Sequence, residues 1–136
     1  MTAVSCQNVE IVQRGYEHFG ATGEMLPEIL HPDFVWDMSK FEGWPEQQTY
    51  AGLDGARQFI ADWSEAWEDW ELEVRDLLDA GDQVVAVMLQ RGRARTTGMR
   101  VDMEFAMVWS FLEGQEIRME MYAQVSEALE DTRLQD

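Results

Sequence analysis

Cysteine, lysine and histidine are scarce in this chain of 136 residues. Its single cysteine, Cys6, has no partner for a disulfide within the chain, so a reducing compartment is expected. The first ten residues hold neither a basic nor an apolar segment, and no apolar run reaches the ~18 residues of a membrane-spanning helix. We therefore predict a cytoplasmic domain without a signal peptide or a membrane anchor.

Positive charge is rare throughout the sequence. Ten basic residues stand against 27 acidic ones, which gives a formal net charge of −17, and Lys40 is the only lysine. A surface this acidic repels nucleic-acid phosphates and anionic lipids. No nucleic-acid or membrane partner is therefore expected, and solubility is a sufficient explanation of the charge.

Motifs for metals, nucleotides and nucleophiles are missing as well. The two histidines, His18 and His31, form no HxxxH pair, and no CxxC is present. The sequence has no GxGxxG or GxxxxGK[ST] phosphate loop and no GxSxG nucleophile elbow. We therefore predict neither a metal nor a cofactor.

The pattern of apolar residues changes its period along the chain. Three segments carry helix signals: 8–20, capped by Asn8; 27–31, opened by Pro27; and 54–70, capped by Asp54. Alternation predicts five strands, at 34–38, 71–78, 82–97, 98–111 and 116–125. This order indicates one α+β domain over 1–136, in which a strongly curved, mostly antiparallel sheet wraps around three N-terminal helices. Such a sheet leaves a hollow that is the natural ligand site.

Four stretches resemble the SnoaL-like branch of the nuclear-transport-factor-2-like superfamily: YEHF at 16–19, LHPDFVW at 30–36, YAGLDGARQFIADW at 50–63 and FLEGQEIRMEMY at 111–122. The resemblance covers about residues 8–130. It implies a cone-shaped, cystatin-like α+β barrel, a homodimer through the outer sheet face, and a pocket with apolar walls and a few polar groups. Members include polyketide cyclases, ketosteroid isomerases and epoxide hydrolases, so the fold does not choose a reaction.

The catalytic positions of the ketosteroid isomerases hold other residues here. Those enzymes use an Asp base and an oxyanion hole made by a Tyr and a protonated Asp. In the register that the resemblance gives without gaps, the Tyr falls on Gly15, the base on Met38 and the protonated Asp on Met107. Tyr16 and Asp37 are only adjacent to two of these positions. A steroid-isomerase mechanism is therefore not expected.

The final strand is where hydrolases and cyclases of the superfamily commonly carry a catalytic Asp. The matching position is Gln124, which can orient a ligand but cannot act as a general base in the usual way. The resemblance also turns Glu120, Tyr122 and Gln124 toward the interior and Met119 and Met121 toward the exterior.

Aromatic and methionine side chains supply the walls of the predicted pocket. In strand 98–111, alternation places the odd-numbered residues from Val101 to Phe111 on one concave face. The predicted ligand-binding residues are Tyr16, Trp36, Met38, Trp44, Trp63, Trp67, Met107, Trp109 and Gln124, with Trp44 as a lid. A stripe of this kind is also typical of a packed core. Six tryptophans nevertheless exceed what a small cone buries, so some should line a cavity.

Asp37 and Tyr122 are the candidate catalytic residues. Alternation favours an outward Asp37, as a solvated charge or the partner of an arginine. Pointing inward between Trp36 and Met38, it would have a pKa raised by burial and would be a candidate acid or base.

A row of arginines has two interpretations. Arg91, Arg93 and Arg95 alternate along one strand, and Arg100 follows the turn. We favour ion pairs with the acidic surface; the alternative is capture of a ligand carboxylate at the rim of the cone.

The sequence therefore predicts a domain that binds a small apolar or aromatic molecule, with isomerase- or cyclase-type proton transfer as its reaction class. The alternative is a non-catalytic dimerisation or protein-interaction module. The apolar face at 101–111 lines the cone in the first case and an interface in the second.

Overall fold

The described part of the chain contains three helices, one 3-10 turn and six strands. The computed structural model describes residues 2–41, 44, 46 and 48–132, with side chains from residue 7 onward, so the side chain of Cys6 lies outside this part. The elements in order are α1 (Thr2–Thr22), η1 (Pro27–Ile29), β1 (Leu30–Asp37), β2 (Thr49–Ala51), α2 (Gly52–Ala66), β3 (Trp67–Asp79), β4 (Gln83–Ala94), β5 (Arg100–Leu112), β6 (Gln115–Tyr122) and α3 (Val125–Thr132). None of the described helices is long and apolar enough to cross a membrane.

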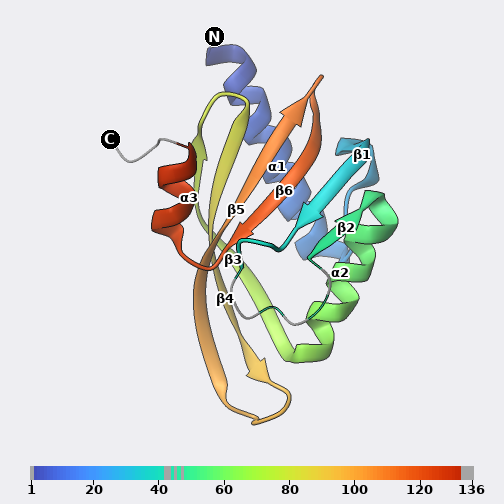
Figure 1. Cartoon of the computed structure of the whole chain (residues 1–136), viewed down its shortest axis with the longest axis vertical. Coiled ribbons are helices and arrows are strands. Elements are labelled where there is room, and N and C mark those ends of the chain that lie inside the picture. Colours follow the sequence, from blue (N-terminus) through green and yellow to red (C-terminus); the bar gives the residue numbers. More distant parts are fainter. Residues whose placement is uncertain (1, 42–43, 45, 47, 133–136) are drawn as a thin grey trace.

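The strands form one sheet in the order β2-β1-β6-β5-β4-β3. All neighbours are antiparallel except β1 and β6, which run parallel. Figure 1 shows α1 behind β5 and β6, α2 beside β1 and β2, and α3 at the left. The predicted α+β class is confirmed. The sheet ends at β2 and β3 and does not close, so it is an open sheet rather than a complete barrel.

Alternation along β5 separates two apolar clusters. Its odd-numbered residues from Met103 to Phe111 pack into the main core, which α1 and α2 cover. The even-numbered Ala106 and Val108 join a smaller cluster under α3. The predicted interior face is therefore confirmed over 103–111, and α3 covers the opposite side of the sheet.

Neither predicted N-cap serves as one. Helix α1 begins before the predicted range 8–20, so Asn8 lies inside it, and its side-chain amide donates to the Gly81 carbonyl at 3.2 Å. This bond ties α1 to the turn between β3 and β4. Asp54 lies in the first turn of α2, which begins at Gly52.

Helix α2 ends before its predicted limit, at Ala66, and Trp67 begins β3. Trp67 has an extended backbone and pairs with Ala94 in β4. The spacing of Trp63, Trp67 and Trp70 imitates a helix. The antiparallel pairing along β4 overrides that local pattern, because tertiary context routinely outweighs propensity.

Strand β6 contains a bulge on the side that faces β5. Phe111 pairs with Glu116, whereas the adjacent Ser110 pairs with Arg118, so the ladder skips Ile117. One additional residue on one strand shifts the alternation of everything before it to the other face.

The residues after the bulge face opposite to the expectation from the resemblance. Met119 and Met121 belong to the main core, whereas Tyr122 packs in the cluster under α3. Glu120 in β6 is the strand partner of Val108 in β5, and Val108 belongs to that outer cluster. The predicted inward direction of Glu120, Tyr122 and Gln124 is therefore wrong, as is the outward direction of the two methionines.

Candidate functional site

A cavity lies between α1, α2 and the interior face of the sheet. The volume that the centre of a water molecule can reach inside this cavity is about 50 Å³, which is enough for more than one water. Its wall includes the aromatic side chains of Tyr16, Phe19, Trp36, Phe59, Trp63, Trp70, Phe105 and Trp109. The site is therefore small, and rigid aromatic rings shape much of its surface.

The cavity brings together part of the predicted ligand-binding set: Tyr16, Trp36, Trp63, Met107 and Trp109. Met38 is buried in the same core without reaching the cavity, and Trp67 is half-buried at the start of β3. Trp44 packs its ring 5.4 Å from that of Phe59 and 5.3 Å from that of Trp63. It packs against these two rings and does not line the cavity.

Glu116 brings a carboxyl group into the cavity wall. The residue is 2% exposed, and its Oε1 has no hydrogen-bond partner in the part of the chain that the structure describes. Burial raises the pKa of the Glu116 carboxyl well above its ordinary value. Glu116 therefore holds a proton under conditions that ionise an exposed glutamate, and it can donate or accept that proton inside the cavity.

Tyr16 is a second polar group of the wall. Its hydroxyl accepts a hydrogen bond from Nε1 of Trp109 at 3.0 Å and donates to Sδ of Met107 at 3.0 Å. Burial raises the pKa of the Tyr16 hydroxyl; the Trp109 bond opposes this rise and the charge of Glu116 adds to it. Tyr16 is therefore a positioned neutral hydroxyl at neutral pH.

Gln90 and Trp36 add two N–H groups. Gln90 is fully buried, and its Oε1 accepts from Nε1 of Trp63 at 2.6 Å. Because an indole N–H only donates, this bond fixes the orientation of the Gln90 amide. Nε2 of Gln90 and Nε1 of Trp36 have no hydrogen-bond partner among the described residues.

The cavity adjoins a surface groove of about 490 Å³ between α1, α2 and β3. The two hollows share the lining residues Tyr16, Phe19, Ile60, Trp70 and Leu72. At this junction the rings of Phe19 and Trp70 lie 6.1 Å apart.

The backbone around Trp70 is shaped by a bulge. Pairing of β3 with β4 shifts between Glu68 and Glu71, and Asp69 between them has a φ of 51°. A Cβ at Gly92 would lie 2.9 Å from Cβ of Trp70. Glycine at position 92 therefore allows the close approach that sets Trp70 at the junction.

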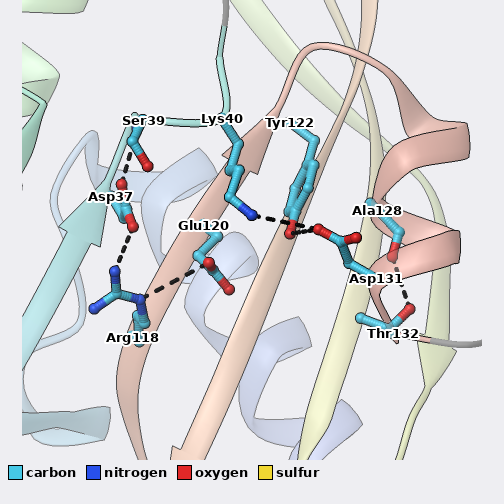
Figure 2. Close-up of polar contacts among 9 residues, drawn as sticks. All are labelled: Asp37, Ser39, Lys40, Arg118, Glu120, Tyr122, Ala128, Asp131 and Thr132. Carbon is cyan, nitrogen blue, oxygen red and sulfur yellow. Dashed lines mark hydrogen bonds and ion pairs between the residues drawn. The ribbon is translucent and has the colours of Figure 1, made fainter.

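Asp37 is not among the residues that line the cavity. Its carboxyl group points toward Arg118 and Ser39 (Figure 2). Its carboxylate forms an ion pair with Arg118 and accepts a hydrogen bond from the Ser39 N–H at 2.8 Å. Burial alone would raise the pKa of Asp37, but the bonds from Ser39 and Arg118 outweigh it, and the pKa is lowered. Of the two outward interpretations, the arginine partner is observed; Asp37 is 4% exposed, so it is not a solvated charge.

Tyr122 takes part in a second set of polar contacts, separate from that of Asp37 (Figure 2). Its hydroxyl donates to Asp131 at 2.7 Å, and Nζ of Lys40 lies 3.4 Å from Asp131 and 5.4 Å from the centre of the Tyr122 ring. Gln124 is exposed just before α3, and its carbonyl accepts backbone hydrogen bonds from that helix. A catalytic role for Tyr122 or Asp37 would have to act on this outer face and stays a prediction.

The arginine row forms ion pairs at the outer side of the sheet. Arg91 contacts Glu73 at 2.9 Å and Arg95 contacts Glu68 at 3.6 Å. The first pair joins β4 to β3, and the second joins the residue that follows β4 to β3, so two of the four arginines agree with the favoured interpretation. No lysine, arginine or histidine occurs among the described residues that line the cavity.

Gln90 and Glu116 are functional candidates that the sequence prediction missed. Gln90 follows Val84, Ala86 and Met88 at alternating positions of β4, so this strand carries a usable signal for an inward Gln90. In a regular strand Glu116 would face outward like Arg118, two residues later. The bulge at Ile117 turns Glu116 inward instead.

Comparison with known proteins identifies the family of this chain. The chain belongs to the SnoaL-like domain family, whose sequence profile matches residues 12–119. TerC, co-crystallised with polyporic acid, is 23% identical, with 93% of this chain and 98% of that chain covered and a TM-score of 0.72. A Jannaschia sp. CCS1 protein classed with the SnoaL-like polyketide cyclases is 24% identical, with coverages of 86% and 85% and a TM-score of 0.68.

A third solved structure with this fold comes from Catenulispora acidiphila. This ketosteroid isomerase-like protein, in complex with trimethylamine, is 15% identical, with coverages of 91% and 92% and a TM-score of 0.69. No curated protein sequence matches the chain. These likenesses establish the fold and leave the reaction open.

Proposed function

We propose that this SnoaL-like domain binds a small apolar or aromatic molecule in the cavity, and that Glu116 carries out isomerase- or cyclase-type proton transfer on it. The observation that carries the proposal is a buried carboxyl group with an unpartnered oxygen in an aromatic wall. Buried polar groups are normally paired, so an unpaired one calls for an explanation. A carboxyl with a raised pKa suits acid–base work near neutral pH.

The surroundings of Glu116 favour this chemistry. Tyr16 offers a fixed hydroxyl in the same cavity, and none of the described wall residues is a cation that would hold Glu116 in its ionised form. The complexes of TerC with polyporic acid and of the Catenulispora acidiphila protein with trimethylamine support small-molecule binding by this fold. A homodimer through the outer face and a cytoplasmic location remain part of the proposal.

A non-catalytic dimerisation or protein-interaction module is the alternative. The apolar face of β5 packs into the interior core, which argues against that face as its interface. The smaller outer cluster is covered by α3 of the same chain.

Ethylbenzene is expected to bind in the cavity and to shift the indole N–H signals of the lining tryptophans. Titration of ¹⁵N-labelled protein, followed by NMR, measures this. The variant Gly15→Leu should abolish saturable binding, because Gly15 lines the cavity and a Cβ there already lies 3.0 Å from Cδ1 of Ile29. The control Gln13→Leu places the same side chain at an exposed position of α1 and should bind normally. Equal binding by both variants would locate the ligand elsewhere.

Proton transfer is expected to depend on Glu116. In D₂O the wild-type protein should accelerate exchange of the benzylic protons of phenylacetone, as measured by ¹H NMR. Glu116→Gln should lower the accelerated rate at least about tenfold, since a general acid or base typically contributes 10²–10⁴. Glu104→Gln, an exposed change in β5, serves as the control. Exchange that persists in Glu116→Gln would remove Glu116 from the reaction.

A further inference from the structure

We propose that the natural ligand is an uncharged molecule whose oxygen atoms accept hydrogen bonds from Trp36 and Gln90. This inference deepens the proposed function and rests on it, because it names the chemical class that the same cavity selects. It concerns the polar end of the ligand, whereas the aromatic wall accounts for its apolar body.

The first observation is where the unpartnered atoms gather. Within the described part of the chain, three buried side-chain atoms have no hydrogen-bond partner: Nε1 of Trp36, Nε2 of Gln90 and Oε1 of Glu116. All three residues line the one cavity. Folded proteins satisfy nearly all buried polar groups, so this coincidence indicates a ligand that satisfies them together.

The second observation is the kind of group that is free. Nε1 of Trp36 can only donate, and the bond from Trp63 to Oε1 of Gln90 leaves the Gln90 amide with only N–H groups to offer. Glu116 in its protonated form is a third donor. A site with three donors is complementary to carbonyl, ether or hydroxyl oxygens.

Charged ligands fit this site less well. An ammonium group carries only donors, so it would find one acceptor in Glu116 and leave both N–H groups unpaired. A carboxylate ligand would meet no cationic side chain in the described wall and would enter a chain with a net charge of −17. The negative faces of the aromatic rings also disfavour an anion. The polar groups therefore select against both charges.

Four probes that each carry a phenyl ring on a two-carbon unit test the inference: ethylbenzene, acetophenone, protonated 1-phenylethylamine and 2-phenylpropanoate, the last with an added carboxylate carbon. Acetophenone is expected to bind tightest. Its affinity should exceed that of ethylbenzene by about fivefold or more for each hydrogen bond gained. Its binding should move the Trp36 indole proton downfield in the wild-type NMR spectrum. This readout requires no variant and so does not depend on a mutant folding.

A matched pair of variants assigns the hydrogen bond. Trp36→Phe removes the N–H and also trims the aromatic wall, so it should weaken both probes, with a loss for acetophenone that exceeds the loss for ethylbenzene by about fivefold. Trp67→Phe, at a half-buried position outside the cavity lining, should change neither affinity. Equal losses for both probes would mean that Trp36 acts through packing alone, and would overturn the inference.

The outcomes separate this inference from the proposed function. If ethylbenzene binds as tightly as acetophenone, or if the ammonium probe binds tightest and loses its affinity in Glu116→Gln, the inference is overturned while the cavity remains a binding site. A preference for 2-phenylpropanoate also overturns it. If none of the four probes binds, the proposed function itself fails.

Discussion

The variant Glu116→Gln is expected to be more stable than the wild-type protein at about pH 8 and to lose that advantage near pH 4. The pKa of the Glu116 carboxyl is raised by burial in the folded state, whereas the unfolded chain has the ordinary value of about 4.3. Between these two pKa values the folded protein holds a proton that the unfolded chain releases. Wild-type stability therefore falls as pH rises toward the folded pKa, with a limiting slope of about 1.4 kcal/mol per pH unit. Glutamine cannot ionise, so the variant lacks this term.

Urea unfolding across this pH range at high salt measures the effect. High salt screens the repulsion among the exposed carboxylates of this acidic chain. Glu104→Gln removes the same formal charge from an exposed position in β5 and should follow the wild-type pH dependence. Parallel curves for Glu116→Gln and the wild-type protein would show that Glu116 does not titrate abnormally.

Replacing Arg118 by methionine is expected to lower the free energy of unfolding at neutral pH by about 2–3 kcal/mol. The change leaves the Asp37 carboxylate without its cation while the side chain of Asp37 remains 5% exposed. The side chain of Arg118 is 41% exposed, so solvent screens the pair and the cost falls below that of a fully buried one. The Ser39 bond remains in the variant and limits the loss further.

The pH dependence of this loss identifies its cause. The pKa of Asp37 is lowered in the folded state, so its contribution is present above the unfolded value of about 3.9 and disappears as pH falls through the folded pKa. Thermal or urea unfolding of Arg118→Met should therefore converge on the wild-type protein under acidic conditions. Arg100→Met, at an exposed arginine of β5, should cost less than about 0.5 kcal/mol. A similar loss in both variants would assign the effect to net charge.

Regular strands gave the most reliable sequence predictions. Residues 83–93 of β4 pair one to one with residues 100–110 of β5, and no bulge interrupts this ladder. Alternation consequently identified the interior face of β5, including Met107 and Trp109 in the cavity wall. The same reasoning gave Asp37 its outward direction in β1.

Predictions failed where long-range pairing changes the local pattern. The helical spacing of Trp67 and Trp70 is real, but these residues are strand residues because β4 supplies their backbone partners. In β6 the expected faces were wrong because they came from the superfamily register and not from the pairing of this chain. Neither signal can be read from one segment alone.

The sequence predicted the aromatic walls of the candidate site but not the polar residues Glu116 and Gln90. Aromatic residues such as Trp36 and Trp63 mark a wall because burial preferences are strong and local. The placement of Glu116 depends on one skipped residue in a ladder of hydrogen bonds, and an isolated glutamate in an acidic chain gives no warning of it. Gln90 was within reach, since it continues the inward alternation of β4.

The skipped Ile117 makes the chemistry of the cavity sensitive to length as well as to residue type. Deleting Ile117 would let β6 pair with β5 without a bulge. The residues on one side of the deletion would then exchange faces, from the interior of the sheet to its exterior and the reverse. A one-codon deletion could thus withdraw the carboxyl from the hollow while every other residue is retained. Relatives that gain or lose a residue at this point of the strand would differ in whether a carboxyl group faces the cavity, even if they differ by few substitutions.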